Sequence, residues 1–183
     1  MKELSQHITF VFDLDNTLVE TNFANNLSYM AAVKKVINTD MDIDFNQRFT
    51  RDKLYACFPN LTERQYKHII AAKNESFYAH MKQTTLNSNL ANLLRVLHLD
   101  GRNTILLTDC RKQRATLLCA YHGLTPFFSE SYFFEDKVDT KYDVLTRRGY
   151  DLNSIVLFEN ETQGKAAAIS NGIPSENIIK VTF

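Results

Sequence analysis

Short apolar runs that stop at acidic or hydroxyl residues recur along this chain. The first run is followed by the tract DLDNT, and two later runs are followed by TD and by ENE. Runs rich in β-branched and aromatic residues that end at turn-forming residues are typical of buried strands. The predicted strands cover residues 8–12, 104–107, 154–158 and 178–181, with a shorter candidate at 132–134.

Helical patterns separate the later strands. They cover residues 111–122, 138–148 and 162–171, and the last of them ends at Asn171-Gly172, a typical C-terminal signal. Strands that alternate with helices indicate βαβ units and a parallel sheet. Right-handed crossovers place the carboxyl ends of such strands along one edge, where function usually lies. The expected fold is therefore α/β, with a Rossmann-like, three-layer parallel sheet.

Residues 18–100 show helical periodicity and no convincing strand pattern. Leu27, Met30, Val33 and Val36 form an apolar stripe within residues 26–37. Further helix-like segments cover residues 43–58, 62–81 and 87–99. We therefore expect a core domain of residues 1–17 and 101–183, interrupted by an all-helical cap insertion with its linkers, 18–100.

The composition of the chain argues against several classes of protein, including nucleic-acid-binding and membrane proteins. The chain has 183 residues, and 21 basic side chains balance 21 acidic ones, so charge gives no general attraction to nucleic acid or anionic lipid. No apolar run approaches 18 residues, and the N-terminal tract lacks the apolar stretch of a signal peptide. Three cysteines without a CxxC motif indicate reduced thiols. We expect a cytoplasmic protein with no membrane and no nucleic-acid partner.

Common catalytic motifs are missing, so the chemistry must rest on carboxylates. With five glycines, the chain holds no GxGxxG and no Walker A loop, and it also lacks HExxH and GxSxG. The predicted strand ends bring Asp13, Asp15, Thr108 and Glu159 to one edge of the sheet. Oxygen ligands of this kind suit Mg²⁺. Each of these residues alone is compatible with an ordinary loop. Their occurrence together, in this order and at the ends of predicted strands, is what indicates a site.

These tracts resemble the motifs of the haloacid dehalogenase-like hydrolases. The run FVFDLDNTL at residues 10–18 is similar to the first motif, D-x-D-x-T after an apolar strand. Residues 104–108 resemble the second motif, and residues 127–141 the stretch that leads to the third-motif lysine. Residues 155–172 resemble the fourth motif and its following helix. The helical insertion stands where members of the C1 type carry their cap.

The resemblance implies a role for each residue. Asp13 would be the nucleophile that forms an aspartyl-phosphate, and Asp15 would be the general acid and base. Thr108, with the backbone amide of Asp109, and Lys141 would bind the phosphoryl group. Thr17 would brace the loop. Mg²⁺ would be held by Asp13, Asp15 and Glu159.

The third and fourth motifs depart from the family pattern. Glu159 stands where Asp is usual and is one methylene longer, and Gln163 occupies the position of a later Asp. Glu161 could compensate for that loss. Lys141 fits the family spacing for the third motif, and Lys137 is the alternative. The departures affect the expected metal site and leave the nucleophile unaffected.

The leading hypothesis is a Mg²⁺-dependent phosphatase that hydrolyses a small phosphorylated metabolite, as a monomer or homodimer. Asp15 favours phosphate esters, because family members that cleave carbon–halogen or carbon–phosphorus bonds lack an acid there. One alternative is a phosphotransferase or sugar-phosphate mutase of the same fold. Another is a non-catalytic domain that binds phosphate or protein. In the cap, Asn22, Asn25, Asn26 and Tyr29 are interpreted as an ordinary polar helix start rather than substrate contacts.

Overall fold

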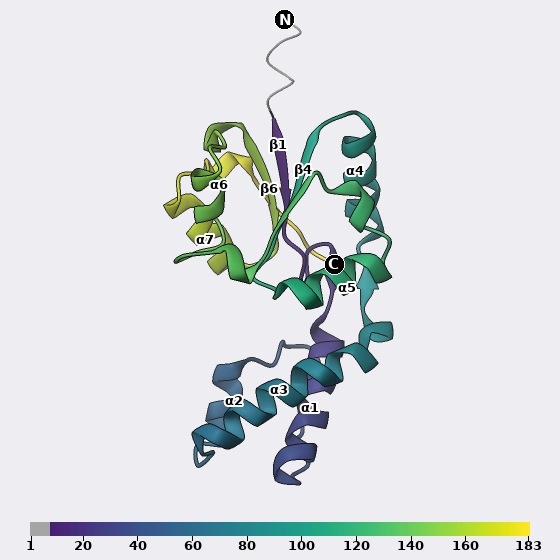
Figure 1. Cartoon of the computed structure of the whole chain (residues 1–183), viewed down its shortest axis with the longest axis vertical. Helices are drawn as coiled ribbons and strands as arrows, with labels where there is room; N and C mark the ends of the chain where they lie inside the picture. Colours follow the sequence, from purple (N-terminus) through teal and green to yellow (C-terminus); the bar gives the residue numbers. More distant parts are fainter. Residues whose placement is uncertain (1–7) are drawn as a thin grey trace, which may run out of the picture. The chain divides into compact units, whose positions relative to one another are not determined.

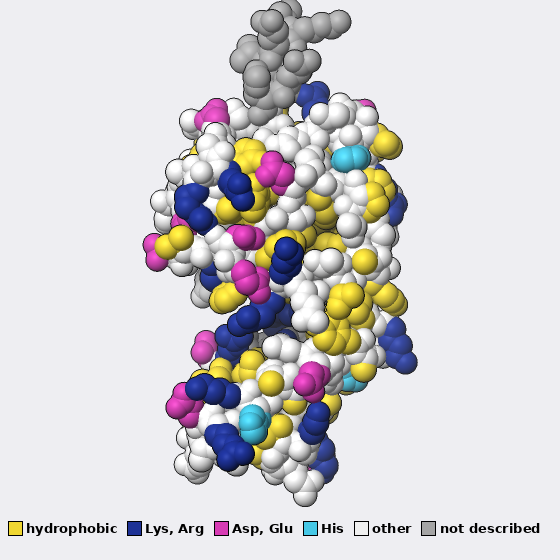
Figure 2. Space-filling view, in the orientation of Figure 1, with side chains coloured by type: hydrophobic (Ala, Val, Ile, Leu, Met, Phe, Trp, Pro, Cys, Tyr) yellow, Lys and Arg dark blue, Asp and Glu magenta, His cyan; other side chains and the backbone are white. Residues whose placement is uncertain are grey.

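The computed structural model describes residues 8–183, and the chain divides into two compact units. The first unit comprises the residues up to Val19 together with Leu86–Phe183, and the second comprises Glu20–Thr85. The predicted strand at 8–12 and the tract that follows it therefore lie in the same unit as all the later predicted strands. Acidic and basic side chains both appear on the visible face of each unit (Figure 2).

A five-stranded parallel sheet forms the centre of the first unit (Figure 1). Its order is β5-β4-β1-β6-β7, so the first strand of the chain lies in the middle. The strands are β1 (Thr9–Phe12), β4 (Asn103–Leu107), β5 (Glu130–Tyr132), β6 (Ile155–Glu159) and β7 (Ile178–Lys180). Phe12 is level with Leu106 on β4 and with Phe158 on β6. This register brings the carboxyl ends of three central strands together, and the predicted parallel α/β fold is confirmed.

Helices cover both faces of this sheet. In Figure 1, α6 and α7 lie on one side of the strands, and α4 and α5 lie on the other. The helices are α4 (Ser88–Leu99), α5 (Lys112–Tyr121), α6 (Asp143–Arg147) and α7 (Thr162–Ser170). Single 3₁₀ turns lie at η2 (Thr125–Phe127), η3 (Phe134–Asp136), η4 (Leu152–Ser154) and η5 (Ser175–Asn177). Val11, Ile105 and Leu157 are fully buried in the core, as expected for strands covered on both faces.

The helix predicted at 138–148 is much shorter in the structure. The carboxylate of Asp143 accepts hydrogen bonds from the backbone N–H groups of Asp139 and Thr140, both at 2.7 Å. A side chain that takes these donors competes with helix formation and favours a turn. The helix therefore starts only at Asp143, and the turn before it carries Lys141.

The second unit is helical, as predicted. It contains α1 (Asn22–Ile37), α2 (Arg51–Cys57), α3 (Glu63–Ala79) and the 3₁₀ turn η1 (Met81–Gln83). Helices α1 and α3 pack against each other around a core that includes Tyr29, Val33 and Ile69. Thr62 and Gln65 form a capping box that starts α3. The two connections to the first unit pair as the short strands β2 (Val19–Glu20) and β3 (Thr85–Leu86).

The helix predicted at 43–58 is confined to α2. Two buried amides of α1 hold the preceding segment in an irregular path. Asn26 accepts from the backbone N–H of Phe49 at 2.9 Å and donates to the carbonyl of Gln47 at 2.8 Å. Asn25 donates to the carbonyl of Phe49 at 2.9 Å. These bonds satisfy backbone groups that a helix would otherwise use, so Asn25 and Asn26 serve the packing of the unit rather than a helix surface.

The predicted insertion extends further along the chain than the second unit does. It was expected to run to residue 100, whereas α4 belongs to the first unit. Leu90, Ala91 and Leu94 of this helix are buried, and the ring of His98 lies 6.0 Å from that of Phe127, edge to face. None of the helices among residues 8–183 is long and apolar enough to cross a lipid bilayer.

Candidate active site

Lys141 joins two carboxylates at the carboxyl edge of the sheet. Its Nζ atom lies 2.7 Å from Oδ1 of Asp13, directly after β1, and 2.7 Å from Oε2 of Glu159, the last residue of β6. All three side chains are at most 8% exposed. Two adjacent central strands and the turn before α6 therefore meet at one buried cation.

Burial and charge shift the titration of this group. Burial raises the pKa of Asp13 from 3.8 to about 7, with Lys141 opposing the shift and Glu159 adding to it. One ammonium shared between two carboxylates cannot fully offset the cost of burying both charges. Burial alone would lower the pKa of Lys141, but Asp13 and Glu159 raise it well above its ordinary value. Lys141 therefore stays protonated.

Glu159 has both carboxylate oxygens occupied. Oε2 accepts from Lys141 and, at 2.8 Å, from the hydroxyl of Tyr142. Oε1 accepts from the backbone N–H groups of Asn160 at 3.0 Å and Glu161 at 3.1 Å. The sequence predicted that Glu159 would ligate a metal. These four contacts make it a buried counter-ion of Lys141, and its role as a metal ligand stays a prediction.

Thr17 connects Asp13 with a residue that the sequence reasoning had not selected, Asn160. The Thr17 hydroxyl lies 3.0 Å from Oδ2 of Asp13 and 3.1 Å from Oδ1 of Asn160. A hydroxyl has a single proton, so it cannot fully satisfy two acceptor oxygens at once. Three oxygen atoms thus converge around one proton, which is an arrangement that suits a cation.

Two of the three predicted metal ligands, Asp13 and Glu159, both contact Lys141, and the metal site stays a prediction. Among the described residues, no group of three acidic, histidine or cysteine side chains is placed to hold a metal ion. Asp13 and Asn160 supply the converging oxygens that fit a hard cation such as Mg²⁺, which often uses few protein ligands and several waters. Asn160 also borders a hollow of about 250 Å³, which is lined in addition by Glu159, Glu161, Thr162, Lys165 and Lys180.

Asp15 forms an ion pair with Arg114, the third residue of α5. The two side chains are 18% and 15% exposed, so the pair is largely shielded from solvent. The first motif therefore carries two acidic side chains that have separate cationic partners, Lys141 for Asp13 and Arg114 for Asp15.

Thr108 and Asp109 follow β4 at the same edge. Thr108 is buried, and its hydroxyl accepts from the backbone N–H of Cys110 at 3.1 Å. The carboxylate of Asp109 is 56% exposed and pairs with Lys137 at 2.7 Å. Of the two candidate lysines, Lys141 contacts Asp13, whereas Lys137 contacts this exposed residue.

Three residues of the site were missed from sequence. Tyr142 follows the predicted third-motif lysine, and Asn160 lies between two glutamates, so each adjoins residues with a more obvious role. Arg114 had a signal: the first turn of α5 holds basic residues and no acidic one, against the usual preference at a helix N-terminus. Contacts between distant residues, which periodicity does not encode, identify all three.

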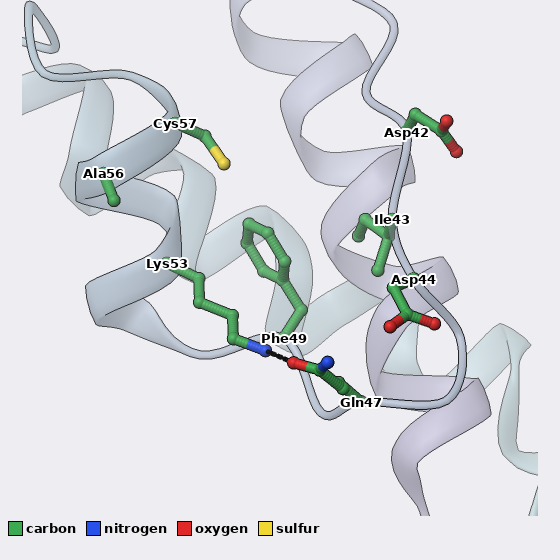
Figure 3. A pocket seen from close by; sticks show the side chains of 8 residues that line it. All are labelled: Asp42, Ile43, Asp44, Gln47, Phe49, Lys53, Ala56 and Cys57. Carbon is green, nitrogen blue, oxygen red and sulfur yellow. Dashed lines mark hydrogen bonds between the residues drawn. The ribbon is translucent and has the colours of Figure 1, made fainter.

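The second unit has a separate hollow of about 200 Å³, shown in Figure 3. It is lined by Asp42, Ile43, Asp44, Gln47, Phe49, Lys53, Ala56 and Cys57. The amino group of Lys53 donates to Gln47 at 3.0 Å across its rim. None of these side chains is among those predicted to carry chemistry, so the candidate site rests on the sheet edge of the first unit.

Comparison with known proteins identifies the family of this chain. The sequence profile described as haloacid dehalogenase-like hydrolase matches residues 10–178. No curated protein shows significant sequence similarity to the chain.

Solved structures share the fold at low identity. A haloacid dehalogenase-like family hydrolase from Streptococcus pneumoniae superposes with a TM-score of 0.79 at 16% identity, over 97% of this chain and 86% of that one. A predicted phosphoglycolate phosphatase from Haemophilus somnus gives 0.78 at 19%, over 98% and 86%. CbbY from Rhodobacter sphaeroides, solved with phosphate, gives 0.77 at 17%, over 96% and 86%. With the profile match over most of its length, the chain belongs to the haloacid dehalogenase-like hydrolase family.

Proposed function

We propose that this chain is a Mg²⁺-dependent phosphatase that hydrolyses a small phosphorylated metabolite through an aspartyl-phosphate. The observation that carries the proposal is the contact of Lys141 with Asp13 and Glu159, both at 2.7 Å in a buried site. A carboxylate with a fixed cation beside it can attack phosphorus while the cation neutralises charge on the phosphoryl oxygens.

In the first step, an oxygen of Asp13 forms a bond to phosphorus and the bond from phosphorus to the ester oxygen breaks. Asp15 gives its proton to the departing alkoxide. Thr108, at the end of β4, and the next backbone amide would receive phosphoryl oxygens. The ionised form of Asp13 is the nucleophile, and the ammonium of Lys141 beside it favours that form against the effect of burial on its pKa.

In the second step, Asp15 takes a proton from water while the water oxygen bonds to phosphorus. The bond between phosphorus and Asp13 breaks, which releases phosphate and regenerates the carboxylate. Asp15 therefore alternates between a protonated and an ionised form. Arg114 contacts its carboxylate and holds it in place for both transfers.

Mg²⁺, when bound, would neutralise phosphoryl charge and orient the transferred group. Asp13 and Asn160 would hold it, since Glu159 is engaged by Lys141, Tyr142 and two backbone amides. One carboxylate and one amide make a ligand set of low charge.

The names of solved proteins with similar folds support phosphate chemistry. One neighbour is described as a predicted phosphoglycolate phosphatase, and another was solved with phosphate bound. We infer by analogy that phosphate monoesters of small metabolites are the substrate class, with the helical unit acting as a cap of the C1 type.

The test is release of phosphate from an aryl phosphate, with Mg²⁺ or with EDTA. Wild type should turn over with Mg²⁺, and Asp13→Asn should lose at least 1,000-fold, on the order of a removed covalent nucleophile. Asp100→Asn removes an exposed carboxyl group of the same unit and should retain activity. Retained turnover in Asp13→Asn would refute the mechanism. If wild type binds phosphate without releasing it from any ester, the chain is a binding domain.

A further inference from the structure

We infer that Arg114 selects phosphate esters whose leaving group carries a carboxylate, an inference that rests on the proposed phosphatase function. The family match and the phosphate chemistry do not specify what lies beyond the ester oxygen. The ion pair between Arg114 and Asp15 adds that information, because it places a guanidinium against the carboxylate that would protonate the leaving group.

The position of Arg114 follows from the role of Asp15. A group that protonates the leaving alkoxide must lie within hydrogen-bonding reach of the ester oxygen. Arg114 contacts the carboxylate of Asp15 directly. With Asp15 in that role, one side chain separates the guanidinium of Arg114 from the ester oxygen, so it can reach a substituent of a small alcohol. Lys141, in contrast, contacts Asp13 and so serves the phosphoryl group.

The chemistry of Arg114 favours a carboxylate there. A guanidinium has five N–H donors in a planar fork, and it can bind carboxylates along more than one edge. In this structure it already holds one carboxylate, that of Asp15. Its side chain is 15% exposed, so a second ion pair would form in a partly desolvated place, where charged contacts are stronger than at the surface. A neutral leaving group would gain no such bond.

The neighbours of Arg114 supply a control for charge alone. Arg111 precedes α5 and Lys112 begins it, so the helix starts with several cations. These two contact Glu135: Arg111 lies 3.9 Å from its carboxylate, and the backbone N–H of Lys112 donates to it at 3.0 Å. Arg114 instead extends to Asp15. The inference rests on this contact between Arg114 and Asp15. A general excess of positive charge at the start of α5 would involve Arg111 to the same extent.

A purely structural role for Arg114 makes a different prediction. If it only braced Asp15, its loss would slow every ester by the same factor. If it binds the leaving group, its loss would act on acidic esters specifically and mainly through KM. A pair of esters that differ at one group separates these two roles.

The experiment compares 3-phosphoglycerate with glycerol 3-phosphate, in which a hydroxymethyl group replaces the carboxylate. Wild type, Arg114→Gln, Arg114→Lys and Arg111→Gln are assayed for kcat and KM on both. We expect wild type and Arg111→Gln to prefer 3-phosphoglycerate by tenfold or more in kcat/KM. Arg114→Gln should reduce that ratio to near one, mostly by raising KM, and Arg114→Lys should keep part of it.

A ratio near one in wild type, or a ratio that survives Arg114→Gln, overturns the inference while leaving the phosphatase proposal intact. Failure of the phosphatase proposal is recognised separately, as the absence of phosphate release from the aryl phosphate and from both esters. In that case the two compounds are compared by calorimetric binding. Tighter binding of 3-phosphoglycerate that disappears in Arg114→Gln supports the selectivity, and equal binding overturns it.

Discussion

Gly164 leaves the space that the carboxylate of Glu159 occupies. A Cβ atom on Gly164 would lie 2.5 Å from Cδ of Glu159 and 2.7 and 2.9 Å from its two oxygens. Real Cβ atoms essentially never approach heavy atoms so closely. The carboxylate of Glu159, at the end of β6, is therefore accommodated because residue 164 in α7 is a glycine. The position of Lys141 depends on both residues, because Lys141 contacts Glu159.

Gly164→Ala should therefore displace Glu159 and weaken its hold on Lys141. Overpacking of this kind costs about 1–3 kcal/mol of stability, and we expect turnover to fall at least tenfold. Combining it with Glu159→Asp shortens the acidic side chain by one methylene and should recover part of both losses, although Glu159→Asp alone is unfavourable. Urea denaturation and aryl phosphate turnover are measured for wild type, the two single variants and the double variant, which together form a double-mutant cycle. Simple additivity of the two substitutions would show that the close approach is unimportant.

The sheet and its functional edge were predictable because their signals are local. The apolar run before Asp13 and the later run before Glu159 each identify a strand from contiguous residues. Parallel pairing then follows from the helices between them. The choice of Lys141 over Lys137 follows from the family resemblance, whose motif spacing Lys141 fits, and Lys141 is the lysine that contacts Asp13.

The features that the sequence could not predict depend on contacts between side chains that are far apart in the chain and are brought together by the fold. The contacts of Glu159 with Lys141 and Tyr142, and the space at Gly164 that its carboxylate fills, join residues that are apart in the sequence. The segment before α2 has apolar residues at helical spacing, yet buried amides from α1, including Asn26, hold its backbone elsewhere. Local periodicity contains neither fact, because each requires knowing which distant residue becomes the neighbour.

Removing Lys141 should be far more damaging than removing Lys137. Lys141→Ala leaves two buried carboxylates without their shared cation, and breaking a buried pair costs about 3–5 kcal/mol. Adding Glu159→Gln should recover part of that loss, since it removes one of the stranded charges. Lys137→Ala is the matched control, because its partner Asp109 is 56% exposed and such pairs contribute about 0–1 kcal/mol. Denaturation midpoints measure all three, and equal losses from the two lysines would contradict the assignment.

The raised pKa of Asp13 predicts how stability varies with pH. Burial raises this pKa from 3.8 to about 7, so the folded state binds the proton more tightly than the unfolded state. The resulting stabilisation is full below the unfolded value and is lost as the pH rises through 7. Between pH 6 and pH 8, wild type should lose about 1 kcal/mol from this group. Asp13→Asn should lack that loss, whereas Asp100→Asn should follow wild type. Parallel pH profiles for wild type and Asp13→Asn would show that Asp13 is not perturbed.

Asn160 should set the strength of Mg²⁺ binding. Its oxygen and Oδ2 of Asp13 both lie within 3.1 Å of the Thr17 hydroxyl, so Asn160→Asp would place a second carboxylate in the same ligand set. Affinity for hard cations rises with ligand charge, and we expect the Mg²⁺ dissociation constant to fall about tenfold or more. Without metal, the new charge would repel Asp13 and lower the melting temperature.

Thermal unfolding across a Mg²⁺ titration measures both effects, because an ion that binds only the folded state stabilises it by RT ln(1 + c/Kd), where c is the free Mg²⁺ concentration, and so raises the melting temperature. Asn160→Ala should weaken the Mg²⁺ response. Asn92→Asp, which adds the same charge on the exposed face of α4, should leave the response unchanged. An Asn160→Asp protein with the wild-type dissociation constant would place the ion elsewhere. If Glu159→Gln alone abolished binding, Glu159 would be the ligand in spite of its contacts with Lys141 and Tyr142.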